Sequence, residues 1–143
     1  DPGTCRPQEE GSSGASSQQP GPLGSNNLVR HLIRNFARSK IFRNRMIFIR
    51  MCDAIIREAP LHVFSDLFMR PMLRLSNDPV KNVRLYWVVT VLPHLRKVGR
   101  LGQKGPVLAA AVRMRRTVGD AEVHRLLDEA KLPEVAEDEI AAL

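Results

Sequence analysis

The sequence has little of what disulfide-linked, metal-binding or membrane-spanning proteins need. It contains two cysteines in 143 residues, Cys5 in a Pro/Gly/Ser-rich stretch and Cys52 in a predicted helix. These two cysteines make neither a disulfide framework nor a set of metal ligands. The apolar run at residues 83–92 is well short of the roughly 20 residues that cross a membrane, and no signal-peptide core is present. We therefore expect a protein of a reducing compartment, cytoplasmic and/or nuclear.

Motifs for catalysis are also missing. Residues 99–105, GRLGQKG, lack the spacing of a phosphate-binding loop, and Asp53 and Asp66 are single carboxylates without a partner for acid–base chemistry. Each histidine lies in a different predicted helix with no second ligand four residues away: His31, His62, His94 and His124. The sequence thus predicts no enzyme activity, no metal site and no cofactor.

The chain divides by composition into a polar start and a helical remainder. Residues 1–25 are rich in Pro, Gly, Ser and Gln, with Leu23 as the one large apolar residue, so we expect them to be disordered. Apolar residues then recur at helical spacing, which predicts helices over residues 26–39 and 42–58, the second ended by Pro60.

The most informative stretch covers residues 64–95. Its first half carries an amphipathic helical stripe from Phe64 to Leu75. Asp78 then fits the N-cap of a second helix, with Pro79 at the first helical position. This second helix is apolar around most of its circumference, so it must be covered on more than one side, which implies neighbouring helix pairs.

A repeat near 40 residues runs through the helical part. The segment starting at Arg45 (RMIF) is matched 39 residues later by the segment starting at Arg84 (RLYW), as expected for two-helix solenoid repeats. A weaker third unit has helices at 106–118 and 121–131 around a Gly119–Asp120 turn. We predict an all-α fold, an α-solenoid of about three antiparallel helix pairs. The predicted repeats span residues 26–58, 60–98 and 103–131, and an acidic tail follows at 132–143.

The segment LRLSNDPVKNVR resembles the junction between the two helices of a HEAT repeat, with Asp78 in the turn and Arg84 early in the second helix. Over about residues 28–95 the sequence is most similar to HEAT scaffold and regulatory subunits of type-2A-family serine/threonine phosphatases. These are the A-type scaffold subunit and the HEAT-type regulatory subunits of protein phosphatase 4. The resemblance implies a non-catalytic scaffold or regulatory module, and a ladder of turn aspartates and helix arginines in which Arg45 is equivalent to Arg84.

In those scaffolds the turns inside the repeats line one ridge that binds catalytic and other subunits. Lys40, Lys81 and Arg43 would give the corresponding ridge a positive charge suited to an acidic partner. The third turn, residues 119–122, departs from the pattern. Carried over by position, the candidate protein-binding residues are Arg38, Lys40, Arg43, Asn77, Asp78, Val80 and Lys81. For Asp78 a structural role in the ladder competes with partner contact, and for Trp87 core packing competes with a role as interface anchor.

The formal net charge of +7 leaves a second interpretation open. Arg and Lys crowd residues 30–116, while the end of the chain is acidic, so a basic α-solenoid that binds nucleic acid or another acidic partner is the alternative. The aromatic residues are expected in the core rather than displayed for base stacking. Transport of protein cargo is a third use of such repeats. The sequence identifies neither the catalytic subunit nor the substrate, the oligomeric state, the completeness of the third repeat, or whether the chain is part of a longer repeat protein.

Overall fold

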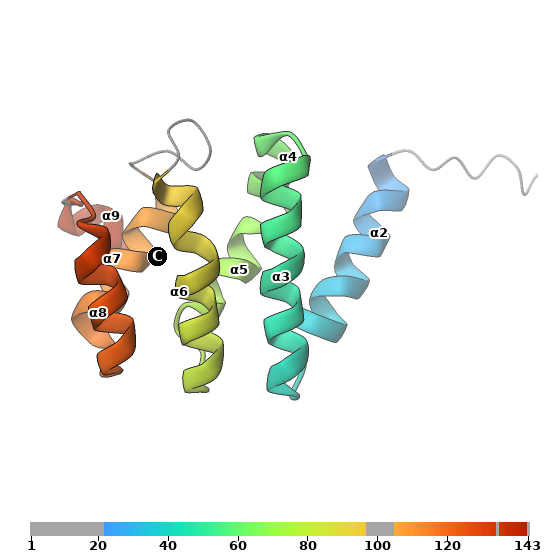
Figure 1. Cartoon of the computed structure of the whole chain (residues 1–143). Coiled ribbons are helices and arrows are strands. Elements are labelled where there is room, and N and C mark those ends of the chain that lie inside the picture. The colour runs from blue at the N-terminus through green and yellow to red at the C-terminus, as the bar shows by residue number, and fades with distance from the viewer. Residues whose placement is uncertain (1–21, 97–104, 134, 143) are drawn as a thin grey trace, which may run out of the picture.

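The computed structural model describes residues 22–96, 105–133 and 135–142, and within these residues it is helical, with no strand (Figure 1). The all-α prediction is therefore confirmed. Residues 1–21 of the predicted disordered segment lie outside the described part. The helices are α2 (Pro22–Leu32), the π-helix η2 (Ile33–Ala37), α3 (Phe42–Glu58), α4 (Leu61–Leu67), α5 (Met69–Leu75), α6 (Lys81–Arg96), α7 (Pro106–Thr117), α8 (Ala121–Ala130) and α9 (Glu137–Ala141).

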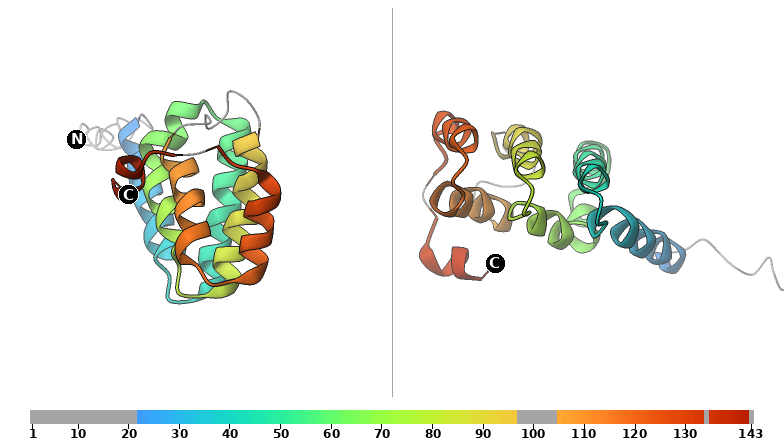
Figure 2. Two further views of the ribbon diagram at one scale, coloured as in Figure 1. Left: turned by 90° about the vertical axis from the view of Figure 1, so that its left-hand side faces the viewer. Right: turned by 90° about the horizontal axis from the view of Figure 1, so that it is seen from below.

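The helices form two layers (Figure 2). One layer holds α3, α6 and α8 side by side, with α6 packed between the other two. The second layer holds η2 with α2, then α4 and α5, then α7. The short helix α9 packs against α7 on the side away from α8.

The first helix begins earlier than the sequence pattern predicted. Residues 22–25, expected to be disordered, form the first turn of α2, so that boundary was wrong. Pro22 suits this position because its missing N–H is not needed in a first helical turn. The same helix ends in a π-turn, closed by the Arg38 N–H donating to the Ile33 carbonyl at 2.9 Å. The turn to α3 follows at once.

The amphipathic stretch predicted as one helix is divided into α4 and α5 at Phe68. Pro71 explains the division, because proline has no N–H and its ring crowds the carbonyl four residues earlier, that of Leu67. The Phe68 N–H still donates to Phe64, and Met72 donates to Phe68. The chain therefore bends without losing its apolar stripe.

The start of α6 also differs from the prediction. The helix begins at Lys81, not next to Asp78, and the Val80 carbonyl accepts from the N–H groups of Val83 and Arg84. The Asp78 carboxylate instead accepts from the Val80 N–H at 2.9 Å, within the turn itself. Such a bond between an aspartate and the backbone two residues later stabilises a turn rather than a helix end.

One continuous core lies between the two layers. Trp87 is fully buried in α6 and its indole N–H donates to the Met72 carbonyl at 2.9 Å, so the core role expected for it is confirmed. The rings of Phe48 and Phe68 lie 6.1 Å apart between their centroids. In α7 the buried residues include Ala109, Ala110 and Ala111. The largest fully buried side chains are Trp87, Phe48, Phe64, Ile49, Ile56, Met72, Leu108, Met114, Leu127, Val83, Val88 and Val91.

Candidate functional site

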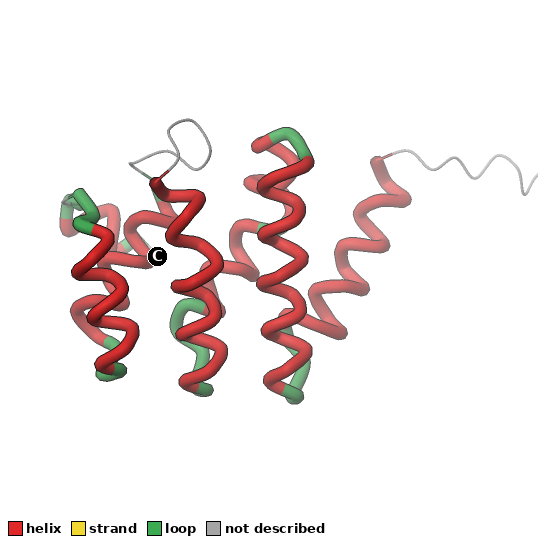
Figure 3. The backbone as a smooth tube through the Cα atoms, in the orientation of Figure 1, coloured by secondary structure: helices red, strands yellow, loops and turns green. Residues whose placement is uncertain are grey.

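Three turns between the layers lie along one edge of the molecule, the lower edge in Figure 3. They consist of residues 38–41, which precede α3, residues 76–80, which precede α6, and residues 118–120, which precede α8. We call this edge the turn ridge. It contains the candidate residues that the sequence pattern placed in the first two turns, together with the first residues of α3 and α6.

An arginine–aspartate pair connects the first two turns. The Arg45 guanidinium donates from Nε and Nη2 to the two Asp78 carboxylate oxygens at 2.6 and 3.0 Å. Its Nη1 donates to the Ser39 carbonyl at 2.8 Å. Because the Asp78 side chain is only 3% exposed and that of Arg45 only 12%, this two-point contact lies largely out of water.

The same arrangement recurs between the second and third turns. Arg84 donates from Nε and Nη2 to Asp120 at 2.8 and 3.1 Å, and from Nη1 to the Asp78 carbonyl at 2.7 Å. The hydrogen bonds from Arg84 hold the pKa of Asp120 below its usual value, and Asp120 in turn raises the pKa of Arg84. Each arginine thus bonds to the turn before its own helix and to the next turn along the chain.

This geometry changes the interpretation of two candidate residues. The Asp78 carboxylate has a structural role, because it is buried and already accepts from Arg45 and from the Val80 N–H. Val80 is half-buried and packs against the core. The neighbouring Asn77 is exposed and remains a contact candidate.

The basic candidates of the ridge are all exposed. They are Arg38, Lys40, Arg43 and Lys81, and none of their side chains makes a hydrogen bond or ion pair with another described residue. Arg45 and Arg84, by contrast, are neutralised by aspartates. The charge that the ridge presents to a partner therefore comes from the four exposed cations.

The third turn resembles the second at its aspartate, which takes part in the ladder, and departs from it in the helix that follows. Asp120 takes the place of Asp78, and Gly119 and Glu122 are exposed. The helix after it lacks the arginine, because Leu126 stands six residues after Asp120, where Arg84 stands six residues after Asp78. In the described residues the ladder accordingly has two rungs and ends at Asp120.

An apolar groove beside the ridge was missed by sequence reasoning. It has a volume of about 440 Å³ and lies between α3 and α6, where it is lined by Phe42, Arg43, Met46, Asn82, Leu85, Tyr86 and Val89. Val89 is 52% exposed, although the apolar circumference of this helix predicted that it is covered on more than one side. The helical period alone does not distinguish a buried position on α6 from a position that lines an exposed groove between α6 and its parallel neighbour α3. The sequence did carry one sign of this groove, because the apolar surface of α6 is wider than the surface that its neighbouring helices cover.

Asp53 has partners that the sequence did not indicate. His94, buried in α6, contacts its carboxylate through Nε2 at 2.6 Å, and Arg57 lies 3.1 Å from its other oxygen. The statement that Asp53 stands alone was therefore wrong. Among the described residues, no serine, threonine or cysteine side chain forms a hydrogen bond with His94 or Asp53. The adjacent Cys52 is buried, and burial raises the pKa of its thiol far above the usual value, which makes it a packing residue.

No group of three or more metal-ligating side chains occurs among the described residues. In the same residues, no helix has the length and apolar character needed to cross a membrane. Comparisons with protein-family models, curated proteins and solved structures found no match to this chain.

Proposed function

We propose that this chain is an α-solenoid of three HEAT-like repeats that acts as a non-catalytic scaffold or regulatory module of a type-2A-family serine/threonine phosphatase. It binds partner proteins through the turn ridge. The repeats correspond to η2 with α3, α4–α5 with α6, and α7 with α8. The phosphatase assignment rests on the resemblance of residues 28–95.

The two rungs of the ladder support the repeat assignment. Equivalent arginines, Arg45 and Arg84, use the same three nitrogens to contact the turn before and the turn after their own helix. A recurring contact of this kind is expected when one structural unit is stacked on copies of itself. It also fixes the spacing between turns, so the exposed residues of the ridge keep a constant arrangement.

The observation that carries the proposed mode of binding is the apolar groove that adjoins a basic ridge. Arg43 belongs to both surfaces, and Tyr86 and Val89 extend the apolar surface along α6. A protein interface combines an apolar centre with a charged rim. Nucleic acid would use the cations but would gain little from Val89 or Leu85. The combination favours an acidic protein partner.

The direct test is capture of purified type-2A-family catalytic subunits on the immobilised chain at low and at physiological salt. We expect retention that persists at physiological salt, since apolar contacts are not screened. Reversing charge in the double variant Lys40→Glu/Lys81→Glu should weaken retention. The matched control, Arg30→Glu/Arg50→Glu, changes the net charge equally at exposed positions away from the ridge.

The outcomes separate the alternatives. Equal loss in both double variants would mean that only net charge matters, and retention of a single-stranded oligonucleotide that falls steeply with salt would favour nucleic-acid binding. A variant Val89→Ser that binds as well as the parent would exclude the apolar groove. Absence of retention for every catalytic subunit tested would refute the phosphatase assignment.

A further inference from the structure

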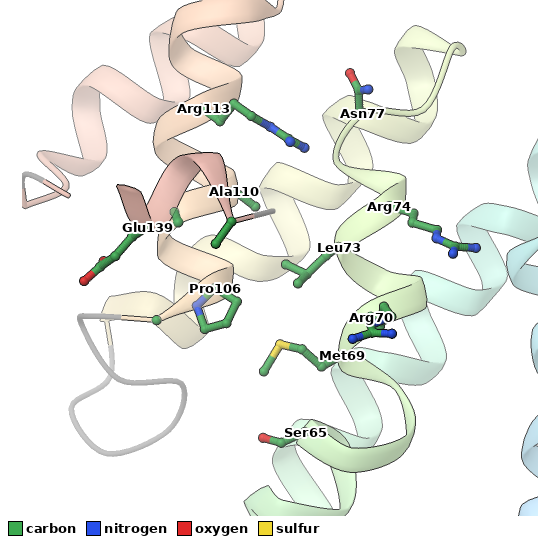
Figure 4. Close-up of a pocket in the computed structure, with 13 residues that line it drawn as sticks. Ser65, Met69, Arg70, Leu73, Arg74, Asn77, Pro106, Ala110, Arg113 and Glu139 are labelled. Carbon is green, nitrogen blue, oxygen red and sulfur yellow. The ribbon is translucent and has the colours of Figure 1, made fainter. Parts of the chain in front are cut away.

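A second groove lies in the other layer of the molecule, between α5 and α7 (Figure 4). It has a volume of about 820 Å³. Met69 and Leu73 of α5 and Ala110 of α7 form its apolar floor, and Arg70, Arg74 and Arg113 also line it. In Figure 4 the Arg113 side chain extends from α7 across the groove toward the α5 side, where Asn77 lies.

The three arginines of this groove have no carboxylate partner among the described residues. Arg115, Arg116 and Arg125 elsewhere in the third helix pair each form an ion pair. In Figure 4 the Arg74 side chain extends away from α7, so Arg70 and Arg113 are the cations that the groove offers to a ligand. An apolar floor with unpaired cations over it is complementary to a segment that carries carboxylates and apolar side chains together.

The same pairing of a carboxylate with an arginine occurs within the chain, on the adjoining surface of α7. The helix α9 is acidic in its first turn, and Glu137 accepts from Arg116 Nη1 at 2.7 and 2.9 Å. Arg116 follows Arg113 by three residues, so both arginines project from the same side of α7. Residues Glu139 and Ala142 of this acidic segment form one end of the groove.

We propose that the groove between α5 and α7 binds an acidic segment of a partner protein, with carboxylates paired to Arg70 and Arg113 and apolar side chains over Leu73. The α9 segment packs on α7 beside this groove and leaves the groove open. This surface is separate from the α3–α6 groove and does not depend on a phosphatase as partner.

The test is fluorescence anisotropy of the full chain with a labelled synthetic peptide made of glutamate pairs alternating with leucine. Glutamine-for-glutamate and serine-for-leucine versions of the peptide are the controls. We expect binding of the parent peptide alone. The double variant Arg70→Glu/Arg113→Glu should raise Kd by about tenfold or more, because two attractive pairs become repulsive. The control Arg30→Glu/Arg50→Glu, at exposed positions on other helices, should change Kd by less than about threefold.

A variant that leaves the charge unchanged tests the contribution of the apolar floor of the groove. Leu73→Asn should also weaken binding, while urea unfolding of each variant confirms that the chain remains folded. Equal effects of the two arginine pairs, or no effect of Leu73→Asn, would overturn the proposal, as would an undetectable interaction with the parent peptide. A single-stranded oligonucleotide that competes fully with the peptide at physiological salt would assign the groove to nucleic acid instead.

Discussion

The Arg45–Asp78 pair offers the sharpest test of how the helix pairs are held together. Replacing Arg45 by methionine keeps an apolar stem of similar length and removes the guanidinium. The change deletes two hydrogen bonds to Asp78, at 2.6 and 3.0 Å, and one to the Ser39 carbonyl at 2.8 Å. It leaves a carboxylate that is 3% exposed, with the Val80 N–H as its one remaining donor among the described residues.

The expected cost follows from this geometry. Removing one partner of a buried ion pair costs about 3–5 kcal/mol, because the other charge stays desolvated. The remaining Val80 N–H and the nearness of the turn to solvent favour the lower value, so we expect Arg45→Met to reduce the free energy of unfolding by about 3 kcal/mol. For a domain stabilised by about 5–15 kcal/mol this is a large fraction. Urea unfolding followed by far-UV circular dichroism measures it.

Two comparisons make the result decisive. Arg43→Met, at an exposed position on the same helix, should change stability by less than about 0.5 kcal/mol. Adding Asp78→Asn to Arg45→Met replaces the stranded charge by a neutral amide, which still accepts from Val80, and should recover about 1 kcal/mol or more. If Arg45→Met lowers the free energy of unfolding no more than Arg43→Met does, the pair does not hold the turns together. The same conclusion follows if Asp78→Asn lowers this free energy as much in the Arg45→Met chain as it does alone.

Three further expectations concern other parts of the molecule. Because the folded pKa of Asp120 is depressed, its stabilising effect is present above its unfolded pKa of about 3.9 and is lost as pH falls toward the folded pKa; Asp120→Asn should flatten this acid dependence of the unfolding free energy. Val83→Asp places an unpaired charge at a fully buried position and should abolish the cooperative thermal transition in circular dichroism; a preserved transition would mean that α6 is oriented differently. Cys52 should react with a thiol reagent only at the rate of unfolding, and rapid modification of the native chain would contradict its burial.

The helix pairs could be predicted because periodicity is a local property. The bounds of α3 were predicted as residues 42–58 and are found there, since an apolar stripe ends at Pro60. The equivalence of Arg45 and Arg84 was visible from their spacing, and the structure gives them equivalent partners. The sequence could not show which turn each arginine contacts. That Arg45 contacts Asp78 of the following turn depends on how the second pair stacks on the first.

The errors at helix ends have a related cause. Residues 64–75 carry an unbroken apolar stripe, so the pattern predicted one helix. The helix nevertheless breaks at Phe68, because Pro71 disrupts the turn that precedes it. Composition likewise assigned residues 22–25 to the disordered segment, yet they are helical as the first turn of α2. Propensity near an element boundary is a weak signal that neighbouring structure overrides.

The ladder also decides which charges are available to a partner, and this bears on the two functional hypotheses. Asp78 and Asp120 form ion pairs with Arg45 and Arg84, and neither forms an ion pair with the exposed cations of the ridge. A ridge with this residual charge would attract any polyanion at low salt. Its neighbour, the groove with Tyr86 and Val89, stabilises only a partner that brings apolar side chains. Salt therefore separates the two hypotheses: nucleic-acid binding would weaken steeply as salt rises, whereas an acidic protein seated in the groove would keep the apolar part of its affinity.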